Sequence, residues 1–158
     1  MGLKTRLTAT AAAMLLAVPL VNEVEGVKYY MYYDVAGVPT VCAGITGTDV
    51  IKGKVYTQKE CDILLAKHMK IAQDAVDKAL KVDVPHSFRA AMYSFTFNVG
   101  GGAYRQSTML KLTNQGKLGE ACEQLWRWVY ITKNGEKVRS KGLHNRRSEE
   151  HKYCVRDL

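Results

Sequence analysis

Two carboxylates and a hydroxyl stand at fixed offsets near the start of the sequence. Glu25 is followed after eight residues by Asp34, and Asp34 is followed after five residues by Thr40. Hydrolysis of a glycosidic bond needs one protonated carboxyl that gives its proton to the leaving oxygen, and a second polar group that holds water or stabilises the oxocarbenium-like transition state. These residues are candidates for that chemistry. Two acids at such a spacing also occur by chance, as a solvated Glu and a turn Asp.

The segment that carries these residues predicts a small β-structure. Aromatic and β-branched residues run from 27 to 46 and are interrupted by Asp34, Gly37 and Pro39. This pattern is typical of one or two short antiparallel hairpins. Asp34 is then expected in a turn, where its carboxylate is well solvated.

The rest of the chain has helical patterns. Thr57 and Glu60 form a capping box, and apolar positions follow at helical spacing to residue 79, as one long helix or two consecutive helices. Pro85 starts a further pattern that ends near Gly100. Shorter helices are expected at residues 108–115, 117–130 and 143–155. A sheet first and helices afterwards predict an α+β fold with the sheet at one end, and a cleft where the two lobes meet.

Three ordered motifs resemble a known family. The first is Glu-Gly at 25–26, Asp-x-x-Gly-x-x-Thr at 34–40 and Gly-Ile-Thr-Gly at 44–47. The second is Phe-Asn-Val-Gly at 97–100 with Ser-Thr-Met-Leu at 107–110, and the third is Gly-Leu-His-Asn-Arg-Arg at 142–147. Together they resemble the phage lysozymes, which are muramidases also called endolysins, over about residues 23 to 156.

The resemblance implies a fold, an activity and a set of roles. The fold would be lysozyme-like, with a small N-terminal β-hairpin lobe and a larger helical lobe. The substrate would be peptidoglycan, cleaved with inversion at the β-1,4 bond between N-acetylmuramic acid and N-acetylglucosamine, so that the host cell lyses. Glu25 would be the general acid, its pKa raised by desolvation. Asp34 would stay ionised and activate water or stabilise positive charge, and Thr40 would orient that water.

Other residues receive smaller roles. Asn98, Arg146 and Arg147 are expected to bind substrate, and an arginine of that pair is a candidate partner for a site carboxylate. Glu23 is a rival for the role of acid, but it lacks the following glycine and the matching offset to Asp34. No cofactor is implied, and we expect a monomer.

The N-terminus carries Lys4 and Arg6 and then an uncharged run at residues 7–21. A cleaved signal peptide would need a small-x-small site, which is missing. A transmembrane helix needs about 20 strongly apolar residues, and this run is shorter, rich in Ala and Thr, and contains Pro19. A core helix is a third alternative, although the run is apolar all round instead of striped.

We therefore expect an uncleaved anchor at residues 1–22 before a lysozyme domain at 23–158. This arrangement resembles the signal-anchor-release endolysins. That resemblance implies export by the host secretion machinery, an inactive form tethered to the host inner membrane, and later release into the periplasm.

Four cysteines fit an oxidising compartment and allow three disulfide pairings. Their positions favour Cys42 with Cys61, which would tie the hairpin to the helix after it, and Cys122 with Cys154, which would join the last two helices. The histidines and cysteines form no Cys-x-x-Cys or His-x-x-x-His pair, so no metal site is expected.

The net charge of +8, from 23 basic and 15 acidic residues, favours a polyanionic partner. No nucleic-acid recognition motif accompanies this charge, so a nucleic-acid partner is not expected. The alternative to an enzyme is a non-enzymatic cationic protein that binds the cell wall or nucleic acid.

Overall fold

The computed structural model describes residues 3–34 and 36–158, with side chains from residue 9 onward. The side chains of Lys4 and Arg6, which precede the uncharged run at residues 7–21, lie outside the described part. In chain order the elements are α1 (Leu3–Glu25), β1 (Lys28–Tyr33), β2 (Pro39–Cys42), the 3-10 helix η1 (Gly47–Asp49), α2 (Gln58–Ala79), α3 (His86–Val99), α4 (Gly101–Arg105), α5 (Thr108–Asn114), α6 (Leu118–Glu123), the 3-10 helix η2 (Gln124–Arg127), β3 (Tyr130–Lys133), β4 (Glu136–Arg139) and α7 (Lys141–Val155).

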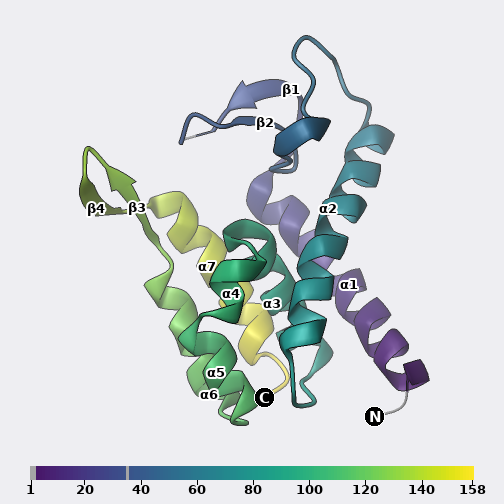
Figure 1. The fold of residues 1–158 in the computed structure, drawn as a ribbon, viewed down its shortest axis with the longest axis vertical. Helices are drawn as coiled ribbons and strands as arrows, with labels where there is room; N and C mark the ends of the chain where they lie inside the picture. Colours follow the sequence, from purple (N-terminus) through teal and green to yellow (C-terminus); the bar gives the residue numbers. More distant parts are fainter. Residues whose placement is uncertain (1–2, 35) are drawn as a thin grey trace.

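Helix α3 is the centre of the helical lobe, and α1, α2 and α7 pack around it (Figure 1). It begins after Pro85 and ends at Gly100, whose φ of +91° no residue with a side chain adopts easily. Every residue from Ser87 to Thr96 is buried. Helix α2 is one continuous helix, and the predicted capping box of Thr57 and Glu60 is present at its start.

The segment predicted as an anchor forms most of α1, which lies along the outside of α3 (Figure 1). Four of its apolar side chains are fully buried in the core: Ala13, Ala17, Leu20 and Val21. The expected boundary between residues 22 and 23 falls inside this helix. By length and hydropathy, no helix in the described part of the chain qualifies as membrane-spanning.

The predicted N-terminal hairpin is present as the antiparallel pair β1 and β2, with Tyr32 opposite Thr40 and Tyr33 opposite Pro39. The disulfide between Cys42 and Cys61 joins the end of β2 to the first turn of α2. This bridge holds the hairpin lobe against the helical lobe.

A second hairpin, β3 with β4, was missed by the sequence analysis, and the predicted helix 117–130 is wrong beyond Arg127. Asn134 and Gly135 turn this hairpin with φ of +51° and +78°. Two positive φ angles are what a two-residue type I′ turn requires, so the Asn-Gly pair was the signal.

Both hairpins lie at the same end of the molecule, away from the N- and C-terminal ends of the chain (Figure 1). The second disulfide, between Cys122 of α6 and Cys154 of α7, has the partner that the sequence positions favoured. The result is the predicted α+β fold: a small β-hairpin lobe and a larger helical lobe.

Candidate active site

Glu25 is the last residue of α1, and Gly26 ends the helix with a φ of +68° that turns the chain into β1. The Glu25 side chain is 21% exposed. A carboxylate at this point stands between the two lobes, because α1 belongs to the helical lobe and β1 belongs to the hairpin lobe.

Gly44, which follows β2, lies close to this carboxylate. A Cβ placed on Gly44 would lie 2.8 Å from Glu25 Oε2, closer than a real Cβ contact allows. The φ of Gly44 is +72°, which also favours glycine. The sequence analysis used this glycine as part of a motif but gave it no role in the site. Its missing side chain is what leaves room for the carboxylate.

Gly44→Ala is expected to lower the rate of substrate hydrolysis about tenfold to a hundredfold, because the new methyl displaces the flexible end of Glu25 and small misplacements of a reacting group are costly. Backbone strain at positive φ should lower the free energy of unfolding by about 1 to 2 kcal/mol. Gly47→Ala is the matched control, since Gly47 has a φ of +86° and nothing within 4 Å of its Cβ position. Equal rates for the two variants, measured on purified peptidoglycan, would contradict this role.

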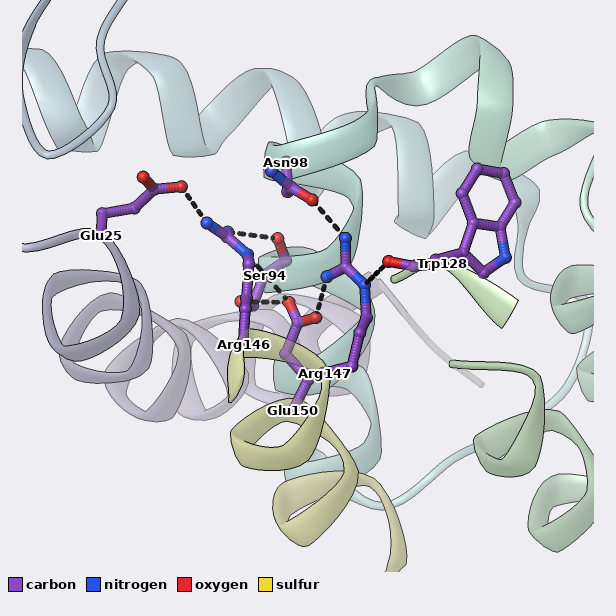
Figure 2. Close-up of polar contacts among 7 residues, drawn as sticks. All are labelled: Glu25, Ser94, Asn98, Trp128, Arg146, Arg147 and Glu150. Atoms are coloured by element: carbon purple, nitrogen blue, oxygen red, sulfur yellow. Dashed lines mark hydrogen bonds and ion pairs between the residues drawn. The ribbon is translucent and has the colours of Figure 1, made fainter. Parts of the chain in front are cut away.

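Arg146 of α7 forms an ion pair with Glu25 Oε1 (Figure 2). Its side chain is 5% exposed, and it also donates to the backbone carbonyl of Ser94 at 3.0 Å. Burial lowers the pKa of Arg146 to about 10, which still leaves it charged at neutral pH; Glu150 acts against this shift and Arg147 adds to it. Arg146 therefore holds the Glu25 carboxylate in place and favours its ionised form.

Glu150, which is fully buried, sits under both arginines. Its Oε2 lies 3.5 Å from Arg146 Nε and accepts a hydrogen bond from the Ser94 hydroxyl at 2.6 Å, while Oε1 accepts from Arg147. Two buried guanidinium groups thus share one buried carboxylate, and Glu25 supplies the second negative charge. The cluster is electrically balanced only when Glu25 is included.

Arg147 extends the cluster to the far side. It donates to Asn98 Oδ1 and, through Nε, to the backbone carbonyl of Trp128 at 2.9 Å. Its guanidinium also stacks over the ring of Phe95 at 4.9 Å. Figure 2 shows a continuous chain of polar contacts from Glu25 to Trp128.

The residues predicted to bind substrate differ in access. Asn98 is exposed, and because its oxygen faces Arg147, its amide nitrogen points toward the side of Glu25 (Figure 2). Arg146 and Arg147 are buried at 5% and 1% exposure, and Arg146 Nε has no hydrogen-bond partner among the described residues. An ion pair with a carboxylate in the site was expected for one of the two arginines, and both form one. Substrate binding by Asn98, Arg146 and Arg147 stays a prediction.

Asp34 and Thr40 meet at the backbone of Val38 in the loop of the first hairpin. Asp34 Oδ1 accepts hydrogen bonds from the N–H groups of Ala36 and Val38, both at 2.9 Å. The Thr40 hydroxyl donates to the Val38 carbonyl at 2.8 Å, and the Asp34 N–H donates to the same oxygen at 3.0 Å. These bonds fix the spacing of the two side chains.

Asp34 and Thr40 each keep one hydrogen-bond acceptor that is not used within the part of the protein that the structure describes. Asp34 Oδ2 has no hydrogen-bond partner among the described residues, and the Thr40 oxygen, whose proton is already donated, keeps lone pairs for a water molecule. No hydrogen bond or ion pair joins either residue to Glu25 in the described part. Glu25 and the hairpin are linked through Gly44.

Sequence reasoning missed Ser94, Trp128 and Glu150. The spacing of Glu150 from Arg146 and Arg147, four and three residues along a helix, does predict ion pairs. It does not predict that they are buried. In the part of the chain with described side chains, no three His, Cys, Asp or Glu residues form a metal-binding cluster.

The sequence matches the Phage lysozyme family model over residues 22–150. The SAR-endolysin of Bacteriophage PS119 is 45% identical over 145 residues, which cover 91% of this chain and 84% of that protein. The SAR-endolysin of Enterobacteria phage P21 is 43% identical over 145 residues, covering 91% and 86%.

Solved structures share the fold. The endolysin from Escherichia coli O157:H7 phage FAHEc1 superimposes with a TM-score of 0.84 at 30% identity, over 90% of this chain and 92% of that one. The muramidase domain of SpmX from Asticaccaulis excentricus gives a TM-score of 0.82 at 25% identity, over 88% and 94%. The similarity therefore spans both lobes.

Proposed function

The chain belongs to the phage lysozyme family and is an endolysin, a glycoside hydrolase of bacterial peptidoglycan, and from this premise we propose that Glu25 is its general acid. The bond cleaved is the β-1,4 bond between N-acetylmuramic acid and N-acetylglucosamine. The alternative of a non-enzymatic cationic binder is not supported by this family membership. The observation that carries the proposal is the position of the Glu25 carboxylate, held between Arg146 and Gly44 where the two lobes meet.

The contact with Arg146 gives Glu25 a fixed orientation but also disfavours its proton. A general acid must be protonated when it meets the leaving oxygen. Entry of a sugar between the lobes removes water from the carboxylate, and desolvation favours the protonated form. When Glu25 is neutral, Arg146 keeps its hydrogen bond to the Ser94 carbonyl and its proximity to Glu150, so its guanidinium still has partners although the cluster then carries one net positive charge.

Asp34 and Thr40 act on the other reactant, the water. Asp34 Oδ1 is held by backbone N–H groups, and Oδ2 serves the water or the developing positive charge on the sugar. The Thr40 oxygen accepts a hydrogen bond from the attacking water and orients it. A water held in this way attacks in a single displacement, which inverts the anomeric centre. Lysis assays of the Glu25→Gln and Glu23→Gln variants, side by side, test the assignment of the acid.

Location is the second part of the proposal. Residues 1–22 are the anchor that tethers the inactive protein to the host inner membrane after export by the host secretion machinery, and release delivers it to the periplasm. Two observations support this: relatives at 43% to 45% identity are named SAR-endolysins, and α1 is apolar on its exposed as well as its buried side. The described fold is then the released, active form.

A more hydrophobic α1 should stay in the membrane. Ala11 and Pro19 are exposed in the docked helix, so Ala11→Leu with Pro19→Leu raises hydrophobicity without touching the core. We expect this double variant to remain in the membrane fraction after depolarisation, with lysis delayed or lost. Ala11→Ser with Pro19→Ser is the matched control and should be released earlier than the wild type. Equal release of both variants, measured by cell fractionation, would contradict the tether.

A further inference from the structure

The rotation of α1 about its own axis is not set by hydrophobicity. Its buried side consists of Ala13, Ala17, Leu20 and Val21, and most of its exposed side is apolar too, with Ala11, Pro19 and Leu15 at 77% exposure, before the exposed Glu23 near its C-terminal end. Turning the helix would exchange one set of apolar side chains for another. Burial of apolar surface is non-directional, so it cannot by itself choose among these rotations.

Two polar contacts do distinguish them: the ion pair of Glu25 with Arg146 at the C-terminal end of α1, and a hydrogen bond near its N-terminal end. The Thr10 hydroxyl donates to Asp77 Oδ2 of α2 at 2.9 Å. The other oxygen of Asp77 accepts from Arg89 at 2.7 Å and from the Tyr93 hydroxyl at 2.6 Å, and both of these residues belong to α3. The carboxylate that receives Thr10 is therefore also held by two side chains of α3, independently of α1.

We propose that Thr10 is a positioning residue for catalysis: its hydrogen bond to Asp77 fixes the rotation and register of α1 and thereby the place of Glu25. A single polar pair in an otherwise apolar interface is a known way to specify register. Glu25 follows Thr10 by fifteen residues on the same helix, about 22 Å along the axis and about 60° around it. A shift of one residue position turns the helix by about 100°, which would carry the Glu25 carboxylate away from Gly44 and Arg146.

The hydrogen bond between Thr10 and Asp77 suits a helix that lies first in the membrane and later against the folded protein, a point that rests on the proposed tether. The charge of this contact lies on Asp77, in the folded body, and α1 contributes only a hydroxyl. A charged side chain on α1 would oppose insertion into a bilayer. A threonine hydroxyl can bond to a carbonyl of its own helix there, and then exchange this bond for Asp77 after release.

Removal of the hydroxyl tests the proposal in the full-length, soluble protein. Thr10→Val keeps the branched shape, and we expect it to lower kcat on purified peptidoglycan about tenfold with little change in KM, because Glu25 is misplaced while the rest of the site is intact. Thr10→Ser keeps the donor and should stay within about twofold of the wild type. Comparison of Thr10→Ala with Thr10→Val separates the loss of the hydrogen bond from the loss of side-chain volume. Ala11→Val changes an exposed neighbour and should leave activity unchanged.

A direct measurement of helix position accompanies the kinetics. Spin labels at Leu15→Cys and Ile71→Cys, both exposed and on α1 and α2, report the distance between these helices. We expect one narrow distance distribution for the wild type and Thr10→Ser, and a broadened or shifted one for Thr10→Val and Thr10→Ala. An unchanged kcat, or a lowered kcat with an unchanged distance distribution, would overturn the role of Thr10. A wild-type chain without hydrolytic activity would instead contradict the function itself.

Discussion

Glu25→Gln is expected to slow lysis of outer-membrane-permeabilised Gram-negative cells by about 10²-fold to 10⁴-fold, the usual contribution of a general acid. Glutamine has nearly the same shape and keeps an oxygen that accepts from Arg146, but it has no proton of suitable acidity to give. Circular dichroism should show an unchanged fold. Loss of the negative charge opposite Arg146 should lower the free energy of unfolding by about 1 to 3 kcal/mol.

Glu23→Gln is the matched control for this result. Glu23 lies two residues earlier on α1, is exposed, and lines a hollow with Asn145, Arg146 and Glu149. Its variant should lyse cells at the rate of the wild type. A Glu25 variant that lysed cells normally, or a Glu23 variant that did not, would reverse the assignment of the acid.

Glu150→Gln is expected to have the largest effect on stability, a loss of about 3 to 5 kcal/mol. The carboxylate is fully buried and balances the charges of Arg146 and Arg147, so its neutralisation leaves two buried guanidinium groups with too little negative charge. A domain of this length loses about 2 to 4 °C of melting temperature per kcal/mol, so we expect a fall of about 10 °C. Thermal unfolding followed by circular dichroism measures it.

The neighbouring residue provides the comparison. Glu149 pairs with Lys152 at the surface, with side chains 30% and 65% exposed. Exposed pairs of this kind contribute about 0 to 1 kcal/mol, so Glu149→Gln should hardly change the melting temperature. Similar melting temperatures for the two variants would mean that the buried cluster does not depend on the charge of Glu150.

Local signals in the sequence predicted much of the fold. The capping box at Thr57, the proline before α3 and the glycine after it each act within a few residues of the boundary they mark, and the structure confirms them. The hairpin β3 with β4 was missed because the expected helix extended to residue 130 and no element was expected at residues 131–139. The Asn134 and Gly135 turn would have corrected it, since that pair marks a type I′ turn.

The packing of α1 against the helical lobe could not be predicted from local sequence signals. A helix that is apolar on every side carries no stripe to indicate the face it buries, so the sequence could not tell a core helix from an anchor. Ala13 and Ala17 become core residues only because α3 offers a surface against which small side chains fit.

The sequence predicted the candidate reacting groups of the site, but not the buried polar residues that hold Glu25 in place. Glu25, Asp34 and Thr40 could be proposed because a motif fixes their spacing along the chain. The buried cluster could not be predicted, because it joins Ser94 of α3 to Glu150 of α7 across 56 residues, and burial of two adjacent arginines is against their usual preference.

The two disulfides have a consequence for resistance to proteases. Exposed segments are where proteases cut, and residues 51–53, Val55 and all of β4 are exposed. The first lies between Cys42 and Cys61, and the second lies between Cys122 and Cys154. A single cut in either place would leave both pieces covalently joined and packed in position. In a lysing cell that spills its proteases, the enzyme can be nicked at both loops and remain one molecule.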